Sequence, residues 1–254
     1  MTSHVAIRTG DGRIHCTIKD GTGAEILFLN GAFSTGRAWK HVLRALPPGF
    51  RTVTFDARGR GRSSESPDYS FSGALADVGR VVEATNLQHP ILVGWSHGAT
   101  LAVRYAATHP GEVSGVLLVD GAFPIHVFHE AARRRIRKQY RLLRVPMHIL
   151  GRLRVLSRMS HRQAANVVIE LDEIDAGLLP DYRGLSCPAL FIVGSGPNPG
   201  SPADEMATMR AATGLATAAN PLVKVHATVG SNHLQILRRD ATTVAEAIET
   251  LAAP

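Results

Sequence analysis

The sequence is poor in the features that mark secreted, membrane-spanning and metal-binding proteins. It has two cysteines in 254 residues, Cys16 and Cys187, far apart and outside any CxxC pair. This spacing predicts neither a disulfide framework nor a zinc site, and we expect two buried, inert thiols. No apolar run approaches the roughly 18–20 residues of a spanning helix. The N-terminus lacks the apolar stretch of a secretory signal, so we expect a cytoplasmic protein without a transmembrane segment.

Acidic residues are in the minority, and the imbalance is local. The formal net charge is +7. Residues 122–184 hold 12 Lys and Arg against 6 Asp and Glu, whereas the remainder holds 16 against 15. The basic character therefore belongs to one segment. Because no recognised reading module accompanies this charge, we expect no nucleic-acid partner.

Short apolar runs alternate with helical patterns along most of the chain. Alternation in Val5–Ile7 and Arg13–Ile18 predicts an N-terminal β-hairpin. The runs predicted as buried strands are Glu25–Leu29, Thr52–Phe55, Ile91–Val93, Val116–Val119, Ala189–Val193 and Leu222–Val225. The predicted helices are Ala38–Leu46, Gly73–Thr85, Ala99–Thr108, Glu205–Ala212 and Thr243–Leu251. This order predicts an α/β fold with a mostly parallel central sheet and helices on both faces.

The alternation stops between Gly121 and Leu185, where the pattern is helical only. Ile136, Tyr140 and Leu143 recur at helical spacing beneath a run of arginines. Ser160–Gln163 matches a capping box before a further helix. We therefore predict a core formed by residues 1–121 and 185–254, and a small, all-helical, Arg-rich cap insertion at 122–184.

One motif carries the chemistry. Gly94-Trp95-Ser96-His97-Gly98 is G-x-S-x-G, between the predicted strand Ile91–Val93 and the predicted helix Ala99–Thr108. As a bare string the motif is weak in a glycine-rich chain, but a sharp strand-to-helix turn is the context in which it presents a nucleophilic serine. The glycines let strand and helix approach closely, and the helix N-terminus adds partial positive charge.

Three further stretches agree with this motif. They are Leu27–Phe33, the D-x-R-G-x-G-x-S turn Asp56–Ser63, and Ser231-Asn232-His233 after the last strand. With them, the chain resembles the α/β-hydrolase fold superfamily, in its serine-nucleophile branch of esterases, lipases and thioesterases. The resemblance implies a nucleophile at Ser96, an oxyanion loop after Leu29 and a base at His233. It also implies a mainly structural role for Asp56 and Arg58.

The acid of the triad is where the sequence departs from the family. Most members carry it just after the penultimate strand, but the turn from Gly194 to Gly200 contains no carboxylate. Asp120, which ends the strand after the nucleophile helix, is the preferred candidate. The alternatives are a structural role for Asp120, an acid at Asp204, or a dyad without an acid.

The resemblance also predicts the remaining site residues. The oxyanion hole would consist of the backbone amides of His97 and Ala32, with Phe33 as the alternative for the second. Asn30 stands where the family commonly has histidine, so the internal hydrogen bonding of this loop is expected to differ. We expect four aromatic residues to line an apolar substrate pocket, helped by cap residues such as Met147 and Met159: Phe33, Trp95, Phe123 and Phe128.

These residues predict hydrolysis of a carboxylic ester, lactone or thioester through an acyl-enzyme on Ser96. Two alternatives stay open. The same triad serves C–C hydrolysis, elimination or cofactor-free peroxidase chemistry in other members of the fold, and some members bind ligands without catalysis. No metal or organic cofactor is implied.

The Arg-rich stretch 133–144 has three interpretations. It is a solvated face of an amphipathic helix, a docking site for an acidic carrier or a phosphate-bearing thioester, or an attachment to an anionic membrane. The substrate is accordingly expected to be a small ester or thioester, with anionic or carrier-bound forms included. The oligomeric state cannot be read from the sequence.

Overall fold

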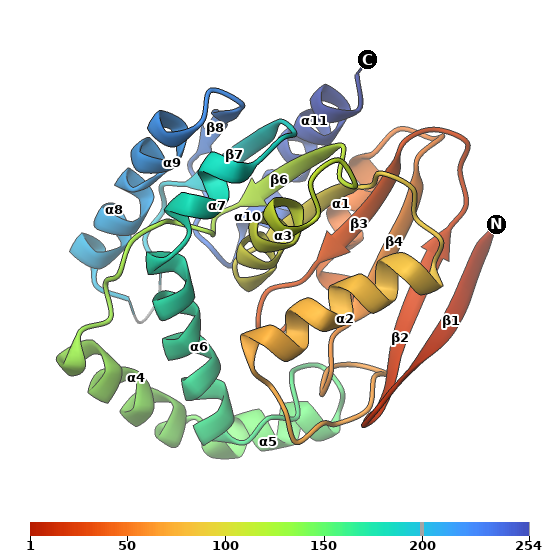
Figure 1. Ribbon diagram of the computed structural model, residues 1–254. Coiled ribbons are helices and arrows are strands. Elements are labelled where there is room, and N and C mark those ends of the chain that lie inside the picture. The colour runs from red at the N-terminus through yellow and green to blue at the C-terminus, as the bar shows by residue number, and fades with distance from the viewer. Residues whose placement is uncertain (199–200, 254) are drawn as a thin grey trace.

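A computed structural model describes residues 1–198 and 201–253 (Figure 1). Its centre is an eight-stranded sheet with the strand order β1-β2-β4-β3-β5-β6-β7-β8. The first two strands form an antiparallel hairpin, β2 pairs antiparallel with β4, and all other neighbours are parallel. The strands are β1 (Thr2–Thr9), β2 (Gly12–Lys19), β3 (Glu25–Leu29), β4 (Arg51–Asp56), β5 (Ile91–Trp95), β6 (Gly115–Val119), β7 (Ala189–Gly194) and β8 (Val223–Val229). The predicted α/β-hydrolase fold class is confirmed.

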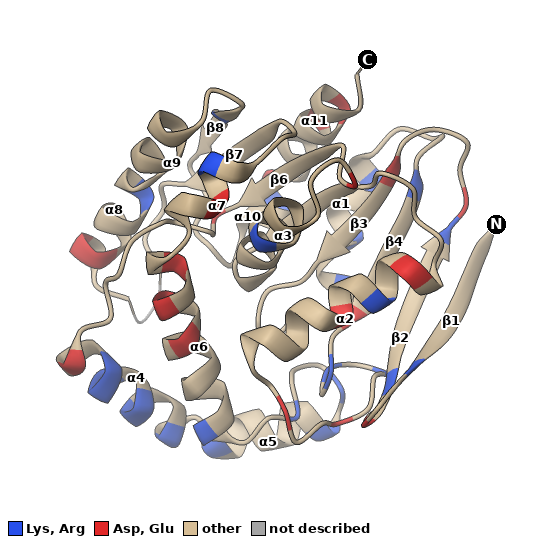
Figure 2. Ribbon diagram, in the orientation of Figure 1, with Lys and Arg blue, Asp and Glu red and all other residues tan. Residues whose placement is uncertain are grey.

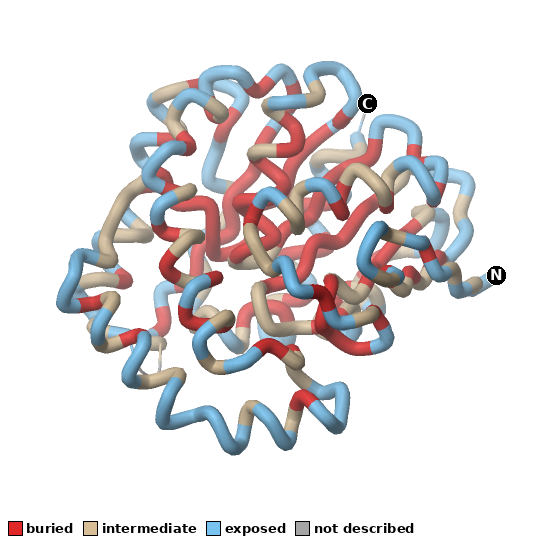
Figure 3. The backbone as a smooth tube through the Cα atoms, turned by 60° about the horizontal axis from the view of Figure 1, so that its bottom comes forward, coloured by how far each residue is buried: buried red, intermediate tan, exposed pale blue. Residues whose placement is uncertain are grey.

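Helices cover both faces of the sheet, because its central strands are apolar on both sides. In β3, Leu27 and Leu29 belong to one buried cluster, whereas Ile26 and Phe28 belong to the other. This is the two-residue period of a strand. The first face is covered by α2 (Phe71–Ala84), α3 (His97–Thr108), α7 (Leu179–Gly184) and α9 (Thr213–Ala219). The second is covered by α1 (Lys40–Ala45), α10 (Ile236–Arg239) and α11 (Ala241–Ala252). Figure 3 shows the resulting buried centre within an exposed periphery.

Residues 122–184, here called the cap segment, contain only helices in the part of the chain that the structure describes. They are α4 (Glu130–Leu142), α5 (Arg144–Arg152), α6 (His161–Ala176) and α7. The predicted capping box is present at Ser160 and Gln163, at the start of α6. The division of the chain into core and cap domains stays a prediction.

A buried hydrogen bond joins the two ends of the cap segment. Tyr182, which is fully buried on α7, donates its hydroxyl to the carbonyl of Ala122 at 2.5 Å. Asn220 then donates to the carbonyls of Tyr182 and Leu185. The segment therefore leaves and re-enters the core at adjacent points.

Several boundaries differ from the sequence prediction. β8 runs to Val229, well past the predicted end at Val225, because it pairs with β7 along its length. The 3-10 turn Gly36–Trp39 and helices α5, α9 and α10 had no predicted counterpart. They are short elements, and tertiary packing determines such elements more than local periodicity does. The helix α8 (Ala203–Ala211) begins two residues before its predicted start at Glu205, with Pro202 as its N-cap.

The start of α3 lies unusually close to the sheet, and two glycines permit it. A Cβ added at Gly98 would lie 2.0 Å from the backbone oxygen of Leu29. One added at Gly94 would lie 2.2 Å from the oxygen of Gly98. Both neighbours are backbone atoms of buried elements and cannot move aside. The glycines of G-x-S-x-G are therefore steric requirements of this turn.

The cap segment is also attached to the core through a buried carboxyl group. Asp175 on α6 accepts the hydroxyl hydrogen bond of Thr100 on α3, at 2.7 Å. Burial raises the pKa of Asp175 to about 8, and nearby Asp172 adds to the effect. The group is consequently neutral at pH 7 in the folded protein.

We predict that Gly98→Ala lowers the free energy of unfolding by about 3 kcal/mol, because overpacking against backbone is not relieved by rotamer changes. Urea unfolding measures this value. Gly214→Ala is the matched control, since Gly214 lies in α9 with no atom within 4 Å of an added Cβ. It should change stability by less than about 1 kcal/mol. Equal effects of the two substitutions would contradict the packing argument.

We predict that stability falls as pH rises from about 4 to about 8 through Asp175. In this range the unfolded carboxyl ionises near 3.8 while the folded one keeps its proton, so the unfolded state binds fewer protons. Asp175→Asn keeps an acceptor for Thr100 and removes this loss. At pH 8 it should raise the free energy of unfolding by about 1–3 kcal/mol, and with it the melting temperature by several degrees. At pH 4 the melting temperature should be nearly unchanged. Exposed Glu249, replaced by Gln, is the control. A gain independent of pH would contradict the assignment.

Candidate active site

Ser96 connects β5 to α3 in a strained backbone conformation. Its φ is 56° and its ψ is −122°, in the positive-φ region that non-glycine residues rarely adopt. The Ser96 amide donates to the carbonyl of Val119 at 3.1 Å, and its carbonyl accepts from Ala99 at 2.8 Å. Gly121 is packed against it, since an added Cβ there would lie 2.6 Å from the Ser96 oxygen. Such strain at one serine is typical of a functional turn.

Asp120 and His233 meet beside this turn. His233 Nδ1 lies 2.9 Å from Asp120 Oδ2. The carboxylate has no exposed surface, and the imidazole keeps 24% of its side chain exposed. With the proton on Nδ1, the carboxylate accepts it and Nε2 is left as an acceptor. This is the tautomer that a general base needs.

The buried carboxylate of Asp120 has two further partners. The amide of Gly194, at the end of β7, donates to Asp120 Oδ1 at 3.0 Å. Nε of Arg210, on α8, lies 3.8 Å from the same oxygen. Hydrogen bonds and a cation offset the cost of burying this charge. Asp120 itself has a φ of 45°, so it lies in a strained turn like Ser96.

His233 is fixed by its backbone as well as by Asp120. Its amide donates to Asn198 Oδ1 at 2.9 Å, and its carbonyl accepts from the indole of Trp95 at 3.2 Å. The rings of Trp95 and His233 have their centroids 5.3 Å apart. The end of β7 and the turn after it therefore supply Gly194 and Asn198 as polar partners, where the family pattern led us to look for a carboxylate. Residues 199–200 of that turn lie outside the described residues.

The predicted oxyanion loop follows β3, and Asn30 organises its start. Asn30 is buried, donates to the carbonyl of Phe55 and accepts from the indole of Trp39 at 2.9 Å. The departure from histidine therefore leaves a well-bonded loop. Asn30 ties the loop to β4 and to the 3-10 turn.

Arg60 is a residue that sequence reasoning missed. It is 5% exposed, and both Nε and Nη2 donate to the carbonyl of Ala32, the former at 2.9 Å. Nη1 donates to the carbonyl of Arg58 at 2.5 Å. No carboxylate pairs with Arg60 among residues 1–198 and 201–253. Burial lowers its pKa to about 10, which leaves it charged at neutral pH. A buried cation thus holds the carbonyl of the oxyanion loop, and a basic residue between two glycines of the turn was the available signal.

His97, the residue after Ser96, is buried in its side chain at the start of α3. Its ring packs edge-on against Phe71 at 5.7 Å between centroids. Burial lowers the pKa of His97 to about 3, with Arg60 adding to the effect, so the ring is neutral. Its backbone amide lies in the first turn of a 12-residue helix, where unpaired N–H groups attract negative charge.

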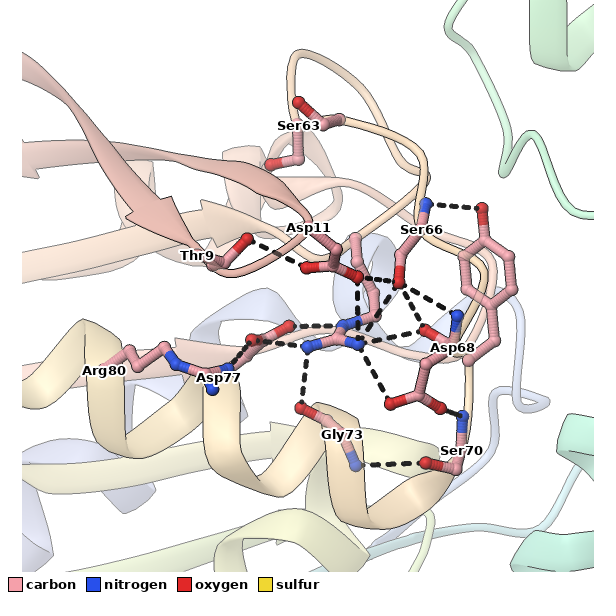
Figure 4. Close-up of polar contacts among 12 residues, drawn as sticks. Thr9, Asp11, Ser63, Ser66, Asp68, Ser70, Gly73, Asp77 and Arg80 are labelled. Atoms are coloured by element: carbon pink, nitrogen blue, oxygen red, sulfur yellow. Dashed lines mark hydrogen bonds and ion pairs between the residues drawn. The ribbon is translucent and has the colours of Figure 1, made fainter.

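The turn Asp56–Ser63 joins a dense polar network, and Figure 4 shows the part of it around Asp68 and Asp77. Arg58 forms a two-pronged ion pair with buried Asp77, at 2.7 and 2.8 Å, and a contact with Asp68 at 3.1 Å. Asp56 accepts from the amides of Gly36 and Arg62, both at 2.9 Å. Both residues make the structural contacts that the family pattern implies. Arg60 is therefore held on a rigid support.

The four predicted pocket residues have different surroundings. Phe33 packs with Tyr140 of α4, with ring centroids 5.6 Å apart, and Trp95 lies against His233. In contrast, Phe123 is 2% exposed and packs in the core with Phe191. Phe128 packs with buried residues of α4 and α6. The structure thus brings two of the four next to the candidate site.

A cavity of about 580 Å³ lies between α5 and the start of α6. Met147 and Met159 line it, and both also pack in a cluster with Ala32 and Phe33. Ser96 is not among its lining residues. The two methionines thus separate this cavity from the oxyanion loop.

Asp204, the alternative acid, lies in the first turn of α8 and is exposed. It has no contact with His233 among the described residues, whereas Asp120 has one. The geometry therefore favours Asp120 among the carboxylates considered.

Comparison with known proteins agrees with the observed fold. A family model described as alpha/beta hydrolase fold matches residues 25–143. The AB hydrolase superfamily protein YisY of Bacillus subtilis is 34% identical over 107 residues, which is 41% of this chain and 40% of that protein. An esterase from Exiguobacterium antarcticum superposes over 99% of this chain and 100% of its own, with a TM-score of 0.77 at 17% identity. A bromoperoxidase from Bacillus anthracis covers 98% and 99%, with a TM-score of 0.73 at 21% identity. At these identities the solved structures show the fold and nothing finer. The chain has the α/β-hydrolase fold, and its residues 25–143 match the family model of that fold.

Proposed function

We propose that this protein is a serine hydrolase that cleaves a carboxylic ester, lactone or thioester through an acyl-enzyme on Ser96. The observation that carries the proposal is the 2.9 Å contact between buried Asp120 and His233, beside the strained turn of Ser96. A nucleophile, a base and an orienting acid at the ends of neighbouring strands form the arrangement that this chemistry needs.

In the proposed reaction His233 Nε2 accepts the proton of Ser96 as the hydroxyl oxygen attacks the carbonyl carbon. The tetrahedral intermediate collapses as the imidazolium returns the proton to the leaving alcohol or thiol. Water then attacks the acyl-enzyme by the same steps in reverse order and releases the acid. Asp120 stabilises the imidazolium and keeps the proton on Nδ1. The net change is the addition of one water across the cleaved bond.

The oxyanion of the intermediate would be bound by the backbone amides of His97 and Ala32. Arg60 acts as a positioning residue, because its guanidinium fixes the Ala32 carbonyl and so the orientation of the loop. It also brings an uncompensated positive charge near the developing negative charge.

Phe33 and Trp95 are the proposed contacts of the acyl or alcohol group. They lie next to Tyr140 and His233 respectively, so an apolar group of medium size fits their chemistry. The burial of Phe123 and the packing of Phe128 support structural roles for these two residues.

We predict that a fluorophosphonate probe labels the native protein and that Ser96→Ala abolishes labelling. Ester turnover should fall by roughly four to six orders of magnitude in Ser96→Ala and His233→Gln. Asp120→Asn should lower it by about 10⁴-fold. In Asp120→Asn the side-chain oxygen of the new asparagine still accepts from the amide of Gly194. Its NH₂ group therefore faces His233 Nδ1, which must then be the unprotonated nitrogen, so that Nε2 carries the proton and cannot act as a base.

Asp204→Asn is the matched control and should leave both rates unchanged. If Asp204→Asn abolished turnover and Asp120→Asn did not, the acid would be misassigned. A folded protein that takes up no probe would overturn the serine-hydrolase proposal and favour a ligand-binding member of the fold. Labelling without ester turnover would favour a different reaction of the same triad, such as peroxide chemistry, which product analysis identifies.

We predict that Arg60→Met lowers kcat for ester hydrolysis by about 10–100-fold with little change in KM, since the oxyanion is bound in the transition state and not in the substrate complex. Arg60→Lys keeps the positive charge but has fewer hydrogen-bond donors, so it should recover part of the lost kcat.

The control is Arg62→Gln, an exposed residue two positions along the same turn whose side chain contacts His15 at 3.4 Å. It should behave as the native enzyme. A change in KM alone, or an equal loss in both variants, would contradict a positioning role for Arg60.

A further inference from the structure

The outer surface of the cap segment exposes an unusual number of aliphatic side chains. Eleven large hydrophobic residues are exposed in the described part of the chain, and six of them fall between residues 142 and 155. The six are Leu142, Leu143, Val145, Ile149, Leu153 and Val155, with exposed fractions of 50–70%. Soluble proteins rarely gather exposed apolar groups in this way without a binding role.

Val145 and Ile149 lie on one side of α5, Leu153 follows as its C-cap, and Val145 also lines the cavity between α5 and α6. Val145, Ile149 and Leu153 recur every four residues, which places them above one another on a helix. The opposite side of α5 carries Met147, which packs with Met159 and Phe33. The helix therefore has two apolar sides, one against the oxyanion loop and one facing outward.

The charges around this surface have a single sign. Residues 133–162 contain eleven of the 28 Lys and Arg residues and none of the 21 Asp and Glu residues. The remainder of the chain thus holds 17 basic residues against 21 acidic ones. The net charge is +11 on this segment and −4 on the rest of the protein. Figure 2 shows the row of basic residues along α4.

Some arginines of the cap segment form ion pairs, but those nearest the exposed aliphatic residues do not. Arg133, Arg135 and Arg158 pair with Glu173, Glu205 and Glu65. Arg141, Arg144, Arg152 and Arg154 are exposed and form no ion pair within the described residues. All four immediately precede an exposed aliphatic residue, namely Leu142, Val145, Leu153 and Val155. A strip of aliphatic side chains is thereby flanked by a strip of free guanidinium groups.

We propose that the outer face of residues 141–155 binds the surface of an anionic lipid membrane. The aliphatic side chains would enter the boundary between headgroups and acyl chains, and the flanking arginines would contact lipid phosphates. None of the helices in residues 1–198 and 201–253 is long and apolar enough to cross a membrane, so α5 would lie in the interface plane.

Two observations favour a lipid surface over an acidic protein. The exposed apolar residues lie directly beside unpaired arginines, and interfacial membrane helices combine an apolar face with Lys and Arg in this way. In addition, the net negative remainder of the chain would be repelled from an anionic surface, which selects one orientation, with the cap segment toward the lipid. The proposal does not depend on which bond the enzyme cleaves.

The test is flotation of the full-length protein with vesicles of phosphatidylcholine alone and of phosphatidylcholine with roughly one third phosphatidylglycerol. We expect binding to the anionic vesicles only, with release at high salt. Replacing Arg141, Arg144 and Arg152 by Gln should weaken binding about 100-fold. Replacing Val145, Ile149 and Leu153 by Ser should weaken it at least about ten-fold.

Matched control variants make the same types of substitution outside the cap segment. Arg8, Arg238 and Arg239 are exposed and are replaced by Gln, and exposed Leu215 and Leu222 are replaced by Ser. Both control variants should bind within about two-fold of the native protein. Melting temperature and probe labelling at Ser96 confirm that each variant is folded.

Failure to bind anionic vesicles would overturn the proposal. The proposal would also be overturned, in favour of nonspecific charge attraction, if the control variants lost binding. The same conclusion would follow if replacing Val145, Ile149 and Leu153 had no effect. Binding to an acidic polypeptide such as polyglutamate, but not to vesicles, would identify an acidic protein as the partner instead. Vesicle binding by a protein that takes up no fluorophosphonate would leave this proposal intact and overturn the proposed hydrolase function.

Discussion

A carboxylate buried without any exposed surface has to be compensated from within the fold, and Asp120 is that carboxylate here. Its partners come from the ends of separate elements: the amide of Gly194 after β7, the ring of His233 after β8, and Arg210 on α8. The requirement to satisfy one charge therefore draws three strand ends and a helix to the same point.

Steric room sets the second constraint. Ser96 can hold a positive φ next to Val119 only because Gly94, Gly98 and Gly121 leave no Cβ where backbone atoms already stand. The electrostatic requirement of Asp120 and this steric requirement act on neighbouring residues, because Gly121 follows Asp120 directly. Charge and shape are thus specified together at the ends of β5 and β6.

The sequence predicted the mostly parallel sheet, the helices on both of its faces and the strand–turn–helix around Ser96, because buried strands and glycine turns leave strong local patterns. Asp120 was proposed from its place at a strand end, and its contact with His233 supports that proposal. What could not be predicted rests on contacts between distant residues. Arg60 meets Ala32 across 28 positions, and nothing local marks an arginine as buried. Phe123 and Phe128 were expected at a pocket, but an aromatic residue in a loop has the same local pattern whether it packs in a core or meets a ligand.

Arg158 gives the cap segment a rigid linkage to the oxyanion loop. Its amide donates to the carbonyl of Gly59, and its guanidinium donates to the carbonyls of Gly61 and Ser63. Arg60, between those two glycines, donates in turn to Ala32. A displacement of the stretch between α5 and α6 must either break these bonds or carry the loop with it. The cap segment is therefore mechanically coupled to the carbonyl of Ala32, and a force on its outer face would be transmitted to the candidate site.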